Sequence, residues 1–141
     1  MDWIPASLLT AVGVQLACQA FKVVYYSVRD GRFTPSYFVS AGGVPSAHAA
    51  FVTAVTTSVG IRSGVASEVF AVSFVFAAIV VYDAFRLRGH VQRHAEVINR
   101  LLGRTGETER VSEMVGHSLP EIVSGILFGG VVAALATLAT A

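Results

Sequence analysis

Apolar residues gather in four long segments of this chain, and polar connections separate the segments. The segments cover about Ile4 to Phe21, Pro45 to Ile61, Val65 to Tyr82, and Ile122 to Ala141. A helix that spans a membrane needs about 20 mostly apolar residues. The first, third and fourth segments reach that length, and the second would span only together with its flanks. The pattern predicts an all-α, multi-pass membrane bundle with about four transmembrane helices, forming a single domain over residues 1–141.

The connections between the segments differ in character. Arg62-Ser63-Gly64 leaves room only for a tight turn, so the second and third segments are predicted to form a helical hairpin. Beyond Tyr82, apolar residues continue at helical spacing with charged residues between them; they are Val91, Ala95, Ile98, Leu101 and Leu102. The third helix is therefore predicted to extend past the membrane surface into the cytoplasm and to end near Gly103.

Composition supports the membrane assignment. The chain is 54% hydrophobic and only 13% charged, against roughly 25% charged residues in soluble domains. Its net charge is only +1, so the chain lacks the excess of basic residues that would indicate a nucleic-acid partner. Cys18 is the only cysteine, which excludes an internal disulfide and a cysteine metal cluster. The first apolar segment is expected to be a retained transmembrane helix.

The basic residues predict an orientation in the membrane. Nine of the ten lie in the first and third connections, namely Lys22, Arg29, Arg32, Arg86, Arg88, Arg93, Arg100, Arg104 and Arg110. With four spans these two connections share one side, which the positive-inside rule makes cytoplasmic. We therefore expect both termini on the opposite side and a cytoplasm-facing site in a bacterial or archaeal plasma membrane.

A glycine-rich loop, Ser40 to His48, leads directly into the second apolar segment. Gly43 gives the backbone the freedom to approach a ligand closely, and Ser46 and His48 fall in the first turn of the helix. The N–H groups of such a helix start attract anions, phosphate above all. An ordinary capped helix with a partly buried histidine explains the loop equally well.

A second helix start is predicted at Gly116 to Glu121. Ser118 and Glu121 have the spacing of a capping box, and His117 comes just before them. In the predicted topology both helix starts lie at the same membrane surface. The third helix brings Asp83 and Arg88 to this surface, and the first helix brings Lys22.

Two histidines, two helix starts and several cations suit a phosphoryl group. Cations and N–H groups bind its oxygens, one histidine attacks the phosphorus, and the other protonates the leaving group. Glu121 would orient His117 through one ring nitrogen, act as the acid of the capping box, or do both. Asp83 and Arg88 would contact phosphate or form a structural ion pair at the membrane edge.

Several motifs in order resemble one known family. They are Gly42-Gly-Val-Pro-Ser-Ala-His-Ala49, Tyr82-Asp-Ala84 with Arg88, Val97-Ile-Asn99, and Gly116-His-Ser-Leu-Pro-Glu-Ile122. The chain resembles the divergent type-2 phosphatidic acid phosphatase family, which is related to acid phosphatases and vanadium-dependent haloperoxidases. The resemblance covers nearly the whole chain from Lys22 onward.

The resemblance implies a role for each matching residue. Lys22 would bind phosphate, and Ser46 would hydrogen-bond one of its oxygens. His48 would be the general acid and His117 the nucleophile that forms a phosphohistidine, with Glu121 as its orienting acid.

The source of the remaining positive charge is left open by the resemblance. Arg29 keeps the family's spacing from Lys22, although Asp30 replaces the proline that usually follows, and Arg32 competes with it. The arginine usually found six residues before the nucleophile is replaced by Val111, so Arg88 or Arg110 would supply that charge.

The expected reaction is metal-independent hydrolysis of a lipid phosphomonoester or diphosphate, without a cofactor. Polyprenyl phosphates, phosphatidic acid and phosphatidylglycerol phosphate all fit as substrates. One alternative is a membrane metalloenzyme that uses His90 and His94, although a solvated helix face explains this pair better. Another is a non-catalytic membrane protein that retains a phosphate pocket. Besides the lipid partners, a homodimer is a hypothesis, because Gly125 and Gly129 have the spacing that permits close helix packing, within one chain or between two.

Overall fold

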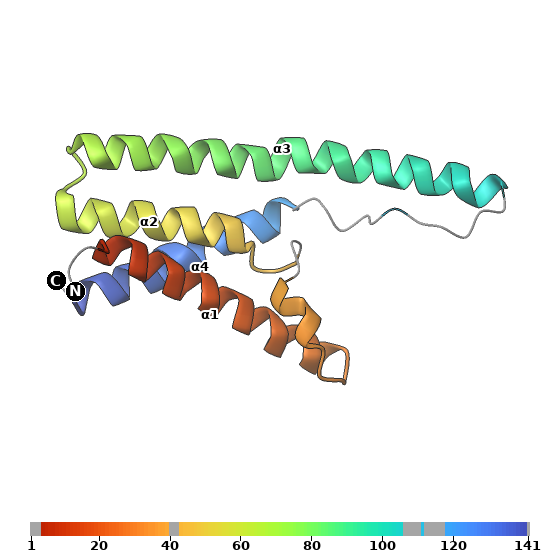
Figure 1. The fold of residues 1–141 in the computed structure, drawn as a ribbon, viewed down its shortest axis with the longest axis horizontal. Helices are drawn as coiled ribbons and strands as arrows, with labels where there is room; N and C mark the ends of the chain where they lie inside the picture. The colour runs from red at the N-terminus through yellow and green to blue at the C-terminus, as the bar shows by residue number, and fades with distance from the viewer. Residues whose placement is uncertain (1–3, 40–42, 106–110, 112–117, 141) are drawn as a thin grey trace.

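The computed structural model describes residues 4–39, 43–105, 111 and 118–140, and all secondary structure in these residues is helical (Figure 1). The elements in chain order are α1 (Ala6–Arg29), the short 3₁₀ helix η1 (Pro35–Val39), α2 (Ala47–Ser63), α3 (Glu68–Thr105) and α4 (Leu119–Leu138). The predicted all-α class is therefore confirmed for the described part of the chain.

Three helical segments of the described chain are long and apolar enough to cross a membrane. They are Ala6–Arg29, Glu68–Arg86 within α3, and Leu119–Leu138. α2 has only 17 residues and is shorter than a typical span. The apolar side chains of the spanning part of α3 are mostly exposed, as expected for a helix surrounded by lipid.

α1 is longer than its apolar segment predicts. The helix continues beyond Phe21 to Arg29 and ends where the N–H of Asp30 donates to the carbonyl of Tyr26. Lys22 and Arg29 were predicted in the first connection, and the structure corrects this, because both lie within α1. The aromatic and β-branched residues after Lys22 continue the helix instead of ending it.

The hairpin of α2 and α3 and the length of α3 agree with the sequence. α2 ends at Ser63, and Gly64 follows with a positive φ of 82° that favours glycine. α3 begins after Ser67, whose hydroxyl accepts a hydrogen bond from the N–H of Phe70. α3 then runs without a break to Thr105, well beyond the other helices (Figure 1).

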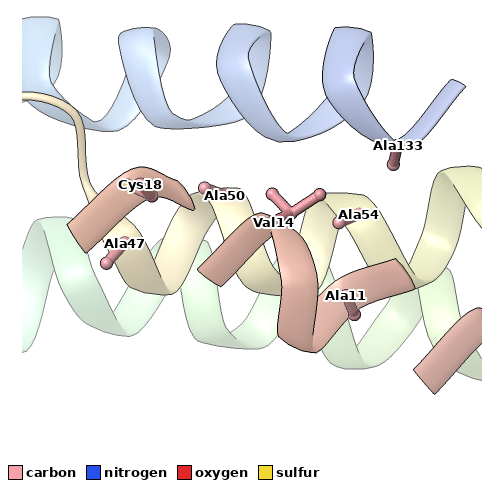
Figure 2. Packing of buried hydrophobic residues seen from close by; sticks show 7 residues of the cluster. All are labelled: Ala11, Val14, Cys18, Ala47, Ala50, Ala54 and Ala133. Atoms are coloured by element: carbon pink, nitrogen blue, oxygen red, sulfur yellow. The ribbon is translucent and has the colours of Figure 1, made fainter. Parts of the chain in front are cut away.

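α2 is the centre of the bundle and packs against α1, α3 and α4. Its buried face consists of small residues, and Figure 2 shows three of these alanines beside side chains of α1 and α4. This cluster contains Ala11, Val14, Cys18, Ala47, Ala50, Ala54 and Ala133. Small residues let the helix backbones approach closely, which favours association inside a membrane.

Two glycines of α4 are required for this packing. A Cβ atom at Gly125 would overlap the carbonyl oxygen of Ser46, and one at Gly129 would overlap the backbone of Ala50. The close packing that their spacing predicts thus occurs between α4 and α2 of the same chain. Gly125 and Gly129 accordingly give no support to a homodimer.

Candidate functional site

Lys22 is the most unusual residue of the described structure, because it is fully buried within an apolar helix. It lies on the face of α1 that also carries Cys18 and Tyr26, all three of which are buried. The charge of Lys22 interacts with that of Glu121 at the start of α4. Lysines are almost never fully buried without an opposite charge, and within membrane helices such residues mark functional sites.

The start of α2 lies against Lys22 and its neighbours. The Cys18 thiol donates to the carbonyl of Pro45 at 3.7 Å. Ser46 is fully buried at the N-cap position, and its hydroxyl accepts a hydrogen bond of 3.4 Å from the N–H of Ala49. Ser46 thus has the predicted capping role, at the end of α2 that faces Lys22.

The starts of α2 and α4 are joined directly. The backbone N–H of Ser46 donates to the backbone carbonyl of Glu121 at 2.9 Å. The side chain of Glu121 accepts a hydrogen bond of 2.9 Å from the N–H of Ser118, which is the predicted capping interaction. Two helix N-termini, 75 residues apart in sequence, are therefore adjacent beside a buried ammonium group. The positive ends of both helix dipoles and Lys22 together favour an anion here.

Gly43 adopts a backbone conformation that few other residues tolerate. Its φ is 94°, and a Cβ atom would lie 2.7 Å from the hydroxyl oxygen of Tyr26. That hydroxyl accepts a hydrogen bond of 3.0 Å from the N–H of Val44. Tyr26 therefore holds the loop that leads into α2. Its spacing of four residues from Lys22 was the available signal.

His48 is half-buried in the first turn of α2. It lines a groove of about 220 Å³ between α1 and α3. Side chains of α1, α2 and α3 form the walls of this groove. The lining residues are Gln15, His48, Phe51, Val52, Phe76 and Val80. His48 thus lies where the polar helix starts meet an apolar groove.

Arg29 and Arg32 lie at the other end of α1. Arg29 forms a salt bridge of 3.0 Å with Asp30, and its guanidinium stacks over the Tyr26 ring at 4.7 Å. Asp30 also accepts a hydrogen bond of 3.0 Å from the Tyr37 hydroxyl. The hydrogen bond from Arg29, and after it the one from Tyr37, lowers the pKa of Asp30. The hydrogen bond that the Tyr37 hydroxyl donates to Asp30 raises the pKa of Tyr37. Arg32 is exposed.

α3 passes the two helix starts at Ala84, which packs against Ala49 and Ile122. Asp83 next to it is half-buried and lines a groove of about 420 Å³ with Arg86 and His90, among others. Further along, the Arg93 guanidinium lies 3.1 Å from Nδ1 of His90, both exposed. Among the described residues, no three histidine, cysteine or carboxylate groups cluster as metal ligands would.

Several predicted site residues lie outside the described part of the chain. These are the proposed nucleophile His117, residues 40–42 of the loop, Arg110, and the side chain of Arg88. The connection before α4 has one described point, Val111. The Nδ2 group of Asn99 donates to the carbonyl of Val111 at 2.8 Å, and the N–H of Val111 donates to Oδ1 of Asn99 at 2.8 Å. Asn99 belongs to Val97-Ile-Asn99, one of the motifs that resemble the family, and its contact with Val111 joins segments 12 residues apart.

A protein family and a membrane protein of known sequence are both similar to this chain. Residues 5–132 match the family described as the divergent PAP2 family. A relative from Bacillus subtilis (strain 168), an uncharacterized membrane protein called YuiD, is 33% identical over 150 aligned positions, which cover 95% of this chain and 92% of the relative. No solved structure matches the chain significantly.

The family match includes α1, the loop before α2, the whole of α3 and the start of α4, so it covers Lys22, Ser46 and Glu121. The apolar helices and the membrane relative agree that this is an integral membrane protein. The chain belongs to the divergent PAP2 family.

Proposed function

We propose that this protein is a lipid-phosphate phosphatase that hydrolyses a phosphomonoester or diphosphate at the membrane surface. The observation that carries the proposal is the fully buried Lys22 beside the hydrogen-bonded starts of α2 and α4. An ammonium group and two helix N-termini neutralise the charge of a phosphate. Membership in a family related to phosphatases supports the same chemistry.

The reaction would take place in two steps. His117 attacks the phosphorus, so that an N–P bond forms and the ester P–O bond breaks. His48 gives its proton to the departing oxygen. In the second step His48 takes a proton from water, the resulting hydroxide attacks the phosphohistidine, and inorganic phosphate leaves as the N–P bond breaks.

The other residues would support this sequence. Lys22 and the N–H groups near Ser46 hold the phosphate oxygens. Glu121 interacts with the charge of Lys22 and caps α4 immediately after His117, so it is suited to orient the nucleophile. Asp83 with Arg88, and Arg29 or Arg32, are proposed to add charge around the phosphate.

The test is phosphate release by the purified protein from a panel of lipid phosphates, with and without EDTA. His117→Ala and His48→Ala should each abolish release, whereas the control variants His90→Ala and His94→Ala should retain it. Activity that survives His117→Ala would overturn the phosphohistidine. Vanadate binding without phosphate release would instead indicate a non-catalytic pocket, and strict EDTA sensitivity a metalloenzyme.

A further inference from the structure

Two polar residues of α1, Gln15 and Gln19, have no role in the proposed phosphate chemistry. Gln15 and Gln19 are one helical turn apart and therefore lie on the same face of α1. Lys22 follows almost one turn later. The side-chain oxygens of both glutamines are shielded from the surface, yet neither accepts a hydrogen bond from the described residues.

Such oxygens are costly inside a membrane helix. A buried acceptor that lacks a donor destabilises a protein by about 1–3 kcal/mol, and no water is available in the bilayer core to supply one. Polar residues in spanning helices therefore face functional cavities as a rule. Two such glutamines in succession indicate a ligand that brings hydrogen-bond donors.

The groove between α1 and α3 connects Gln15 to the proposed reaction, and Gln19 lies one turn further along α1 toward Lys22. Among the described residues α1 and α3 do not pack directly against each other, and α2 lies between them. The groove is lined by Gln15 of α1, His48 of α2 and apolar residues such as Phe76 of α3. His48 is the proposed proton donor to the departing oxygen, so the atoms attached to that oxygen enter this groove.

We propose that Gln15 and Gln19 bind a hydroxyl or amide N–H on the leaving group, next to the phosphorylated carbon. This subsite rests on the proposed phosphatase function and defines its substrate class. A free hydroxyl at this position exists in phosphatidylglycerol phosphate, whereas polyprenyl phosphates and phosphatidic acid lack a donor there. The apolar residues of the groove would hold the adjoining hydrocarbon.

A matched pair of substrates tests the subsite. The probes are 1-O-hexadecylglycerol 3-phosphate, which has a free 2-hydroxyl, and its 2-O-methyl ether, which has none. The unaltered protein should hydrolyse the hydroxyl compound with a higher kcat/KM. Gln15→Leu and Gln19→Leu should each reduce this preference by roughly three- to tenfold, the effect of one hydrogen bond, and the double variant should remove it.

Hydrolysis of the methyl ether reports whether each variant is folded, because this substrate makes no use of the glutamine oxygens. Thr53→Val is the control, since it removes a hydroxyl from a second groove, which is lined by residues of α2, α3 and α4. A preference that persists in the double variant, or no preference in the unaltered protein, would overturn the subsite alone. No release from either compound would overturn the proposed function and the subsite with it.

A second comparison tests which groove receives the hydrocarbon. Val80 lines the groove with His48, while the adjacent Val81 lines the second groove with Thr53. Val80→Phe should raise the KM for the hexadecyl substrate severalfold more than the KM for soluble glycerol 3-phosphate, which has no hydrocarbon chain. Val81→Phe should not separate the two substrates. The reverse result would assign the hydrocarbon to the other groove and contradict the proposal.

Discussion

Asn99 and Val111 are joined by two hydrogen bonds, because the Asn99 amide donates to the carbonyl of Val111 and accepts from its N–H. This pairing holds the connection between α3 and α4 against α3, six residues before His117. Asn99 is 92% buried, so its amide is protected from competing water.

Asn99→Leu should therefore accelerate amide hydrogen exchange at Val111 and lower kcat for phosphate release. The loss of two hydrogen bonds corresponds to about 1–3 kcal/mol of local stability. Arg100→Ala, at the exposed neighbouring position, serves as the control. Unchanged exchange at Val111 in Asn99→Leu would show that the pairing does not restrain the connection.

Lys22→Met should weaken the binding of vanadate roughly ten- to hundredfold, because a charged hydrogen-bond donor to the anion is lost. Methionine is apolar and of similar length, so the melting temperature should stay constant or rise. Titration with vanadate and a thermal melt measure the two effects. Arg62→Met is the matched control, since Arg62 lies at the other end of α2 and contacts Thr140. Equal weakening in both variants would contradict a specific role for Lys22.

Gly129→Ala should destabilise the bundle by about 1–3 kcal/mol, because its Cβ would overlap the backbone of Ala50. The neighbouring Gly130 is a natural control. Its Cβ would lie 3.6 Å from Thr53, an ordinary contact, and alanine favours the helix by roughly 1 kcal/mol. Thermal unfolding in detergent should therefore separate the two variants in opposite directions. Similar melting temperatures would mean that α2 and α4 pack less closely.

Tyr26→Phe should loosen the loop before α2 by about 1 kcal/mol, because Val44 loses its hydrogen-bond acceptor. Hydrogen exchange at Val44 and the KM for a lipid phosphate measure this change. Tyr25→Phe is the control, because the adjacent Tyr25 is exposed. If the two variants behaved alike, Tyr26 would have no special role at the loop.

Asp30 makes the end of α1 sensitive to acid. Its pKa lies below the ordinary value of 3.8, because Arg29 and Tyr37 donate to the carboxylate. A depressed pKa stabilises the folded state above pH 3.8, and the contribution disappears as the pH falls through the depressed value. Asp30→Asn should therefore lower the melting temperature slightly at pH 7 and leave it unchanged near pH 2. A difference that persists at pH 2 would contradict this origin.

The sequence predicted those parts of the fold that follow from local pattern. Helical periodicity after Tyr82 correctly extended α3 to near Gly103, and Gly64 marked the hairpin turn. The end of α1 was placed too early, since a lysine in an apolar run resembles a membrane boundary. Only tertiary packing reveals that Lys22 is fully buried.

The candidate site was predicted only in part, because local sequence patterns do not show contacts between distant segments. Ser46 and Glu121 were recognised from capping patterns, which depend on residues three apart. Their mutual hydrogen bond and the contact of Tyr26 with Gly43 join distant segments, so no local pattern indicated them. Gln15 and Gln19 interrupt the apolar run of α1 in the sequence, but only the structure shows that Gln15 lines a groove together with residues of α3.

The short α2 has a consequence for access to the site. It begins level with Cys18, while α1 continues past this point to Arg29, roughly 16 Å further at 1.5 Å per residue. The 17 residues of α2 extend about 25 Å, less than the hydrocarbon core of about 30 Å. Because α1, α3 and α4 pack around α2, this shortfall leaves the start of α2 below the level that α1 reaches at Arg29. Under the proposed function, a phosphate headgroup would descend between the longer helices to reach Lys22, while its hydrocarbon stays in the leaflet.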